Sequence, residues 1–376
     1  MKKILVIFGT RPEAIKMAPV ASELKECPGV EVRVCVTAQH REMLDQVLEI
    51  FRIEPNYDLN LMSNGQTLCE LFSKVLLGVT EVLMDWKPDL VLLHGDTTTT
   101  SAASMACFYQ CISIGHVEAG LRTDNIWSPW PEEYNRRLAG LVSRLHFAPT
   151  AQARENLLAE KVSDNSIYVT GNTVIDALLH VSNRIDSDQN LQSKLQEKFS
   201  FLSPRKRTLL VTGHRRENFG DGMLSICRAL LILSQRDDLD IVYPVHMNPN
   251  VKGPVEDSLR DSMNIHLLPP QDYLSFVYLM KRSDIILTDS GGIQEEAPAL
   301  GKPVLVMRET TERPEAVEAG TARLVGTNAE RIVHEVESLL DDSKAYFLMA
   351  TSKNPYGDGT AAQQIRYAIS SHFNLL

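Results

Sequence analysis

The sequence predicts an α/β protein of two domains, each built on a parallel β-sheet. With 376 residues the chain is longer than one usual domain. Short β-branched runs alternate with longer amphipathic stretches along the chain, and this alternation is typical of βαβ crossovers. The alternation falls into two series, separated by a polar segment poor in strand-forming residues at 186–207.

Each series supplies its own set of predicted strands. The first predicts strands at residues 4–8, 30–36, 90–94 and 112–117. The second predicts strands at residues 208–212, 241–245, 265–268, 285–288 and 304–306. Residues 174–198 are expected to form the opening helices of the second half. Residues 354–359 break the pattern before a helix expected at 360–370.

Composition narrows the class of protein. The apolar fraction of 44% and charged fraction of 23% are ordinary for a globular enzyme. A net charge of −10 without a basic block argues against nucleic acid as a partner. No apolar run approaches the roughly 18 residues of a membrane span, and the apolar start is too short for a signal peptide. The six cysteines lack Cys-x-x-Cys spacing, so we expect a reduced, cytoplasmic protein.

The segment at residues 284–298 is the most informative one. A short apolar strand ends at Asp289-Ser290-Gly291-Gly292, and a helix is expected from 293 to 300. A strand, a glycine turn and a helix start together present free N–H groups to an anion. Glu296 lies one helical turn further on, where a carboxylate can accept hydrogen bonds from a sugar diol. The segment could seat a nucleotide diphosphate, although the glycines alone are more often an ordinary βα turn.

Two basic residues follow the first predicted strand. Pro12 suits a first helical position, so Arg11 and Lys16 lie near the opening of a helix. They either neutralise the negative charge of a ligand or form a solvated basic pair on a surface helix. This segment alone leaves both interpretations open.

Three acidic residues stand after predicted strands or at the start of a helix in the first half. Asp96 and Glu118 each follow a strand, and Glu132 enters a helix from a proline-rich loop. Helix capping would explain any one of them. Three together suggest acid–base chemistry, because a proton donor and a proton acceptor need separately tuned groups.

The corresponding place in the second half holds a histidine. His214 stands in the polar cluster at 213–218, directly after a predicted strand. It is a candidate proton carrier or phosphate donor, but a lone histidine there is more often structural. No zinc-type spacing such as His-Glu-x-x-His occurs, so no metal is predicted. Gly357, Gly359 and Ala362 match the letters of a dinucleotide fingerprint, but no strand precedes them, so no nicotinamide site is predicted.

Several motifs resemble those of the bacterial non-hydrolysing UDP-N-acetylglucosamine 2-epimerases. The likeness runs through nearly the whole chain, in order. It is carried by residues 8–19, 95–96, 116–122, 128–133, 213–218, 288–298 and 312–316.

The resemblance implies a fold, an assembly and a site. The expected fold is α/β, with two Rossmann-like domains in the GT-B arrangement, an active site in the cleft between them, and a homodimer. The expected domains are residues 1–171, residues 172–358 for UDP, and a helix at 359–376 that returns to the first domain. The implied catalytic residues are Asp96, Glu118, Glu132 and His214. The implied substrate-binding residues are Arg11, Lys16, Asp96, Glu118, His214, Gln271, Phe276, Ser290, Gly291, Gly292, Glu296 and Arg313.

The implied reaction interconverts UDP-N-acetylglucosamine and UDP-N-acetylmannosamine without a cofactor, for surface polysaccharide precursors. The hydrogen at C2 is not acidic, because no carbonyl adjoins C2 in the bound sugar. Elimination of UDP gives a 2-acetamidoglucal, and re-addition with a proton on the other face inverts C2. This route needs a base, an acid on the opposite face and a stabilised leaving group. Asp96 is the favoured base.

Three alternatives fit parts of the same pattern. A GT-B glycosyltransferase would bind the same UDP-sugar but would need an acceptor. A hydrolysing epimerase would release free N-acetylmannosamine and UDP. A non-catalytic UDP-sugar sensor would not need Asp96, Glu118 and Glu132 together.

Overall fold

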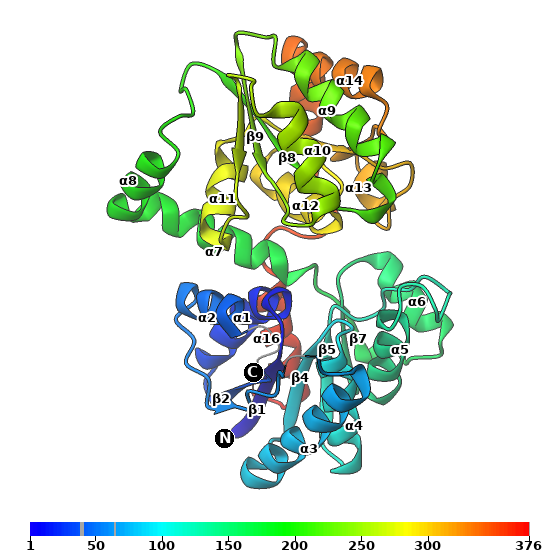
Figure 1. Cartoon of the computed structure of the whole chain (residues 1–376). Helices are drawn as coiled ribbons and strands as arrows, with labels where there is room; N and C mark the ends of the chain where they lie inside the picture. The colour runs from blue at the N-terminus through cyan, green and yellow to red at the C-terminus, as the bar shows by residue number, and fades with distance from the viewer. Residues whose placement is uncertain (38–40, 64, 376) are drawn as a thin grey trace. The chain divides into compact units, whose positions relative to one another are not determined.

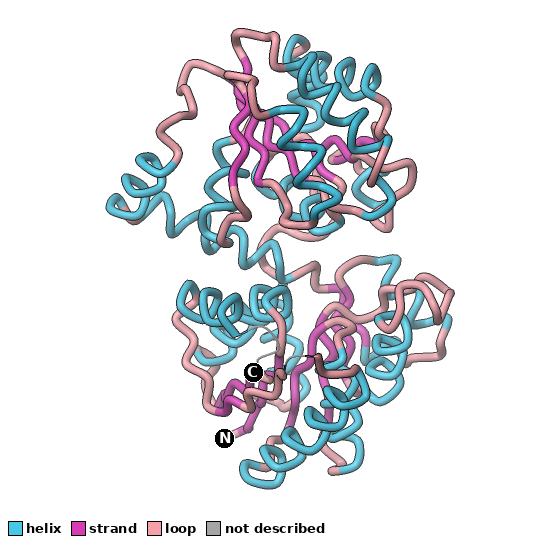
Figure 2. Tube along the Cα trace, viewed as in Figure 1, coloured by secondary structure: helices cyan, strands magenta, loops and turns pink. Residues whose placement is uncertain are grey.

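The computed structural model describes residues 1–37, 41–63 and 65–375, with the backbone alone at 41–43. The chain forms two compact units (Figure 1). Unit 1 consists of residues 1–177 and 356–376, and unit 2 consists of residues 178–355. In both units the strands lie side by side, with helices packed on the sheet (Figure 2). The domain limits at 171/172 and 358/359 stay a prediction about functional domains.

Unit 1 contains a parallel sheet in the order β3-β2-β1-β4-β5-β6-β7. Its strands are β1 Lys2–Phe8, β2 Val30–Val36, β3 Tyr57–Asp58, β4 Leu90–His94, β5 Ser113–Val117, β6 Leu145–Ala148 and β7 Ile167–Val169. Its helices are α1 Arg11–Lys25, α2 Arg41–Ile50, α3 Leu68–Trp86, α4 Thr98–Tyr109, α5 Glu132–Val142, α6 Ala151–Ala159 and α16 Ala361–His372, and α7 Thr173–Ser187 begins in this unit. The order turns outward in both directions from β1 and β4, as in doubly wound folds.

Apolar spacing explains how the helices cover this sheet. On α3, Leu71, Val75, Val79 and Val82 recur at helical intervals and are buried. They pack with small residues of α4, among them Ala103, in one core over β1, β4 and β5. Residues 4–8 of β1 and 90–93 of β4 are buried apolar runs, which is the pattern expected of central parallel strands.

Unit 2 contains a second parallel sheet, in the order β10-β9-β8-β11-β12-β13. Its strands are β8 Arg207–Thr212, β9 Leu239–Pro244, β10 Ile265–Leu268, β11 Ile285–Thr288, β12 Val304–Val306 and β13 Ala322–Leu324. Its helices are α8 Gln189–Lys198, α9 Asp221–Leu233, α10 Pro249–Leu259, α11 Tyr273–Arg282, α12 Gly291–Glu296, α13 Pro314–Glu318, α14 Ala329–Asp341 and α15 Ser343–Ala350. Side chains from α9, α10, α14 and α15 share one core with β8, β9, β11 and β12.

All nine strands predicted from the sequence are present, with ends shifted by up to two residues. The strands β3, β6, β7 and β13 were not predicted. The helical segment expected at 174–198 is correct in extent but is broken at Asp188. The Asp188 carboxylate accepts a hydrogen bond from the Leu191 N–H at 3.0 Å, so it caps a new helix instead of continuing the old one. No helix in the described part of the chain is long and apolar enough to span a membrane.

The end of the chain packs within unit 1. Helix α16 lies against α1. Shortly after the end of α1, Sγ of Cys27 lies 3.3 Å from Oγ of Ser370 on α16. The backbone N–H of Asn172 donates to the Tyr356 carbonyl at 2.7 Å. The Asp176 carboxylate accepts a hydrogen bond from the N–H of Ala362 at 2.8 Å, at the start of α16. The start of α7 therefore holds the returning segment in place.

We expect the Asp176 contact to make stability depend on pH. Burial raises the pKa of Asp176 to about 6 from an ordinary value of 3.8. Between those values the folded chain holds a proton that the unfolded chain releases, so the free energy of unfolding falls as pH rises, by at most about 3 kcal/mol. Asp176→Asn keeps an acceptor for Ala362 and carries no charge. Its Tm should exceed that of the wild type at about pH 7.5, and the difference should shrink as the pH falls through about 6 and disappear below about 3.8, as thermal unfolding followed by circular dichroism would show. A Tm difference that does not change with pH would contradict the assignment.

Candidate active site

In each unit, candidate residues follow the strands at which the order of the sheet reverses. In unit 1 the reversal lies between β1 and β4, and in unit 2 between β8 and β11. In open α/β sheets, ligands bind beyond the carboxyl ends of the strands at such points, because the two loops diverge there. In unit 1 Asp96 lies on the loop after β4, and Arg11 is the first residue of α1, directly after the loop that follows β1. In unit 2 His214 and Ser290 lie on the two loops.

A buried carboxylate joins the two loops in unit 1. Glu13, on α1, is only 2% exposed. One of its oxygens accepts hydrogen bonds from the N–H groups of Gly9 and Thr10, at 3.0 and 2.8 Å. The other accepts hydrogen bonds from the hydroxyls of Thr97 and Thr100, at 2.6 and 3.2 Å. Glu13 therefore fixes the β1–α1 loop against the start of α4.

Glu118 is held by several donors directly after β5. Its carboxylate forms an ion pair with Lys16 and accepts a hydrogen bond from Asn172 Nδ2 at 2.9 Å. His94 Nε2 lies 3.7 Å away. Burial alone would raise the pKa of Glu118, but Lys16 and His94 hold that pKa well below its ordinary value. The backbone of Glu118 has φ of +62°, a strained conformation for a non-glycine residue and one that is found at functional sites.

Asp96 is ion-paired to a residue that the sequence did not point to. Its carboxylate contacts the Arg136 guanidinium on α5. Its backbone carbonyl accepts a hydrogen bond from Asn135 Nδ2 at 2.9 Å. Glu133 is fully buried and also binds Arg136, at 3.4 Å. The start of α5 is thus tied to the β4–α4 loop.

Glu132 and Arg11 differ from these paired groups. Both side chains are partly exposed. Neither makes a hydrogen bond or an ion pair with any residue that the structure describes. The acids of this unit therefore include two ionised, cation-paired carboxylates, Glu118 and Asp96, and one carboxylate outside such a network, Glu132.

A buried carboxylate has the corresponding place in unit 2. Asp289 follows β11 and is fully buried. Its Oδ2 accepts hydrogen bonds from the N–H groups of His214 and Arg215, at 2.9 and 2.8 Å, and from Asn218 Nδ2 at 3.2 Å. It thereby joins the loop after β8 to the turn after β11. The His214 ring is 43% exposed and stacks on His246, with 5.4 Å between ring centres.

The glycine turn of unit 2 differs in detail from the sequence prediction. The helix expected at 293–300 starts at Gly291 and ends at Glu296, and a 3-10 turn, Ala297–Leu300, follows it. The backbone of Ser290 is extended and forms the N-cap of the helix, and Gly291 and Gly292 form its first two residues. A Cβ at Gly292 would make only ordinary contacts, none closer than 3.9 Å. The packing of unit 2 itself therefore does not require glycine at position 292.

The other predicted residues of unit 2 lie on α11, on α12 and near α13. Gln271 donates from Nε2 to the Pro269 carbonyl at 2.6 Å, just before α11, and Phe276 lies on α11. Glu296 ends α12. Arg313 precedes α13 and forms an ion pair with the buried Glu295.

Sequence reasoning missed the residues that hold the predicted ones. Arg136 could have been suspected, because it stands one helical turn after Glu132, on the same side of α5. Asn172 and Asp289 gave no comparable signal, because an Asn or Asp at a strand end usually caps a helix. His116 was also missed; burial lowers its pKa to about 3, so it remains neutral, with Nε2 2.7 Å from the Gly95 carbonyl oxygen.

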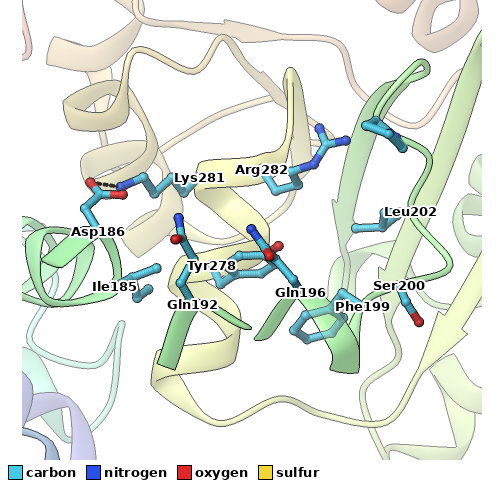
Figure 3. A pocket seen from close by; sticks show the side chains of 11 residues that line it. Ile185, Asp186, Gln192, Gln196, Phe199, Ser200, Leu202, Tyr278, Lys281 and Arg282 are labelled. Carbon is cyan, nitrogen blue, oxygen red and sulfur yellow. Dashed lines mark hydrogen bonds and ion pairs between the residues drawn. The ribbon is translucent and has the colours of Figure 1, made fainter. Parts of the chain in front are cut away.

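A cavity of about 430 Å³ lies elsewhere in unit 2. Phe199 and Tyr278 stack in its wall, and Lys281 and Asp186 are ion-paired at its edge (Figure 3). It contains none of the predicted site residues.

Comparisons with known proteins agree with one another. A family model described as UDP-N-acetylglucosamine 2-epimerase matches residues 22–370. The UDP-N-acetylglucosamine 2-epimerase of Salmonella typhimurium is 57% identical over 371 residues, which is 98% of this chain and 99% of the relative. The crystal structure of UDP-GlcNAc 2-epimerase from Neisseria meningitidis bound to UDP-GlcNAc has a TM-score of 0.90 and 51% identity, covering 98% of this chain and 100% of that one. The UDP-GlcNAc 2-epimerase structure from Methanocaldococcus jannaschii has a TM-score of 0.86 and 33% identity, covering 98% and 99% of the two chains.

We expect Glu13 to be among the most sensitive positions of unit 1. Glu13→Ala leaves N–H and hydroxyl donors without their acceptor and should reduce the free energy of unfolding by on the order of 3 kcal/mol. Glu13→Gln should cost less, because an amide oxygen can still accept from the two N–H groups. Urea unfolding measures both, with Glu26→Ala as the control at an exposed position directly after the same helix, expected within about 0.5 kcal/mol of wild type. Equal stability of Glu13→Ala and the control would contradict this role.

Proposed function

The chain belongs to the UDP-N-acetylglucosamine 2-epimerase family, and from this we propose that it interconverts UDP-N-acetylglucosamine and UDP-N-acetylmannosamine by elimination and re-addition of UDP. The observation that carries the proposal is 57% identity to a named epimerase over 98% of the chain. In this proposal unit 1 supplies the acids and bases, and unit 2 binds UDP.

The chemistry requires a group that accepts a proton from carbon. In the elimination, the C2–H bond gives its proton to a base, and its electron pair forms a double bond between C2 and C1. The C1–O bond breaks, and its electron pair leaves with UDP. Re-addition reverses these changes with a proton delivered to the opposite face of C2. Two carboxyl groups on different faces satisfy this requirement.

The ionisation states in unit 1 suit this assignment. Asp96 is paired with Arg136 and Glu118 with Lys16, so both are anionic and can accept protons. We propose that Asp96 takes the C2 proton. Glu118 and Glu132 are the candidates for returning a proton from the other face. Glu132 has no ion pair with the residues that the structure describes.

The UDP site is proposed on unit 2 from the family resemblance. Ser290, Gly291 and Gly292 are assigned to the diphosphate, and Glu296 to the ribose. Support comes from Gly292, which is exposed. The surrounding structure has room for a side chain at this position, so a ligand that approaches the backbone closely would explain the glycine. His214 and Arg11 would stabilise the charge on the departing diphosphate.

The rest of the uridine site follows from the same resemblance. Gln271 and Phe276 are assigned to the uracil, an aromatic ring beside an amide being suited to a planar polar base. Arg313 and Lys16 complete the proposed substrate-binding set. We place the reaction in the cytoplasm, without a cofactor, as a supplier of precursors for surface polysaccharides.

Proton NMR tests the proposal. The sample contains the protein and UDP-N-acetylglucosamine in deuterated water, with no acceptor, metal or nicotinamide added. We expect UDP-N-acetylmannosamine to accumulate with deuterium at C2, because the proton removed exchanges with solvent. Free N-acetylmannosamine with UDP would instead identify a hydrolysing epimerase. An unchanged substrate that is nevertheless bound would contradict epimerisation and would leave a glycosyltransferase or a sensor.

Substitution of the acids tests their roles. Asp96→Asn, Glu118→Gln and Glu132→Gln should each lower kcat by about 10²–10⁴-fold, the usual contribution of a general acid or base. UDP affinity, measured by isothermal titration calorimetry, should change by less than about threefold, because UDP is assigned to unit 2. The exposed Glu155→Gln serves as the control. A variant that keeps more than about half of the wild-type kcat would remove its residue from the mechanism.

We further propose that the chain acts as a homodimer through unit 1. Large apolar side chains are exposed on α3, α4 and α5, among them Leu77 at 66%, Phe108 at 56% and Leu141 at 82%. These helices pack against one another in that order, so the side chains belong to one helical layer. An apolar surface of this kind is typical of contacts between copies.

The charged variants Leu77→Glu and Phe108→Glu should each shift the protein from dimer to monomer, since a carboxylate in an apolar interface loses its hydration without a partner. Sedimentation velocity measures the change. Leu348→Glu is the matched control, because Leu348 is 72% exposed but lies on α15 of unit 2. A wild-type protein that is monomeric at micromolar concentration would refute the proposal.

A further inference from the structure

The environment of His214 contains a group that the proposed mechanism has not used. The buried Asp289 carboxylate has one oxygen, Oδ2, that already accepts hydrogen bonds from three donors. The other oxygen, Oδ1, is buried and has no hydrogen bond from any residue in the described part of the chain. This oxygen lies 3.4 Å from Nδ1 of His214.

We propose that Asp289 is a positioning residue for His214, holding the imidazole as the tautomer with its proton on Nδ1 and leaving Nε2 free to act on the diphosphate. This inference rests on the proposed function for the identity of the ligand only. The pairing itself rests on the distances within unit 2.

The tautomer of His214 follows from the missing hydrogen bond at Oδ1 of Asp289. A buried carboxylate oxygen without a donor costs free energy. Nδ1 of His214 is the nearest ring nitrogen, and when it carries hydrogen it can point a positive N–H dipole at Oδ1. The opposite tautomer would place the lone pair of Nδ1 against the charge on Oδ1. The Nδ1–H form is therefore the stable one, as in other pairs where a carboxylate orients a histidine.

The carboxylate is itself rigidly placed. The backbone N–H of Asp289 donates to the Thr212 carbonyl at 3.2 Å, across the β8–β11 pair. The hydroxyls of Thr212 and Thr288 lie 2.6 Å apart in the same register. Asn218, which donates to Asp289, also donates to the Met307 carbonyl at 3.1 Å. One side chain therefore positions both the backbone and the ring of His214.

Charge gives the pair a second effect. Burial lowers the pKa of His214, and His246 and Arg215 beside it act in the same direction, whereas Asp289 opposes them. Without Asp289 the imidazolium would be harder to form. As UDP leaves, its diphosphate gains negative charge, and a protonated His214 could donate a hydrogen bond from Nε2 to it. Asp289 would then stabilise the imidazolium in this step without contacting the substrate.

The tautomer can be observed directly in the intact wild-type protein. Two-dimensional ¹H–¹⁵N multiple-bond spectra of histidine-labelled protein at about pH 8 distinguish the Nδ1–H and Nε2–H forms, and His214→Gln identifies the signal. We expect the Nδ1–H form. A wild-type His214 in the Nε2–H form would overturn the proposal.

Asp289→Asn supplies the second test. Its amide oxygen can still accept the backbone N–H groups of His214 and Arg215, while its NH₂ group would face Nδ1 and favour the Nε2–H form. We expect the tautomer to reverse, kcat to fall by about 10²-fold or more, and KM for UDP-N-acetylglucosamine to change by less than about threefold. The limb of the pH–rate profile that reports a protonated His214 should move to lower pH, because the imidazolium loses its anionic neighbour.

Asn218→Ala is the matched control. It removes another contact of Asp289 Oδ2 from the same loop but leaves Oδ1 beside His214, so the Nδ1–H form should persist. Loss of activity in Asp289→Asn with an unchanged tautomer and pH profile would reduce Asp289 to a structural role and refute the proposal. Failure of the proposed function is separable, since a wild-type protein that does not epimerise could still show the Nδ1–H tautomer.

Discussion

Each unit depends on one buried carboxylate that joins the two loops at the reversal of strand order. Glu13 does so between the loops after β1 and β4, and Asp289 between those after β8 and β11. A buried charge is tolerated only when several donors surround it. The ends of two adjacent parallel strands supply such donors, because free N–H groups and hydroxyls from two loops converge there. The loops that carry Asp96, His214 and Ser290, and the start of α1 with Arg11, are therefore held in place by buried groups that need no ligand.

Two of the carboxylates proposed for catalysis have different partners from Glu13 and Asp289. Glu118 and Asp96 are balanced by one cation each, Lys16 and Arg136, rather than by neutral donors alone. A neighbouring cation keeps an acid ionised but also makes it a weaker base. Substrate that draws the cation toward its own negative charge would release part of that hold. In the proposed mechanism, this pairing would couple the proton affinity of Glu118 to the presence of the diphosphate sugar.

Sequence reasoning recovered the central strands because their apolar runs are long or β-branched, as in Ile285–Thr288. It missed β6, Leu145–Ala148, which has no β-branched residue, and β3, which has only two residues. Candidate site residues were found where they follow a recognisable strand. Their partners were not, since Arg136 is 40 residues from Asp96 and Asn172 is 54 residues from Glu118. Contacts over such separations are decided by the register of the sheet and by helix placement, which local pattern does not encode.

The return of the chain to unit 1 has a consequence for biosynthesis. Helix α16 covers the face of α1 with Ile365, Ala368 and Ile369, yet it leaves the ribosome only after all of residues 178–355. Roughly 335 residues separate the end of α1 from the start of α16, so at about 5–20 residues per second α1 waits about 17–70 s for α16. During that interval the nascent chain exposes the face of α1 against which α16 later packs. Folding of the second unit is thus inserted into the folding of the first, and α16 closes the first core.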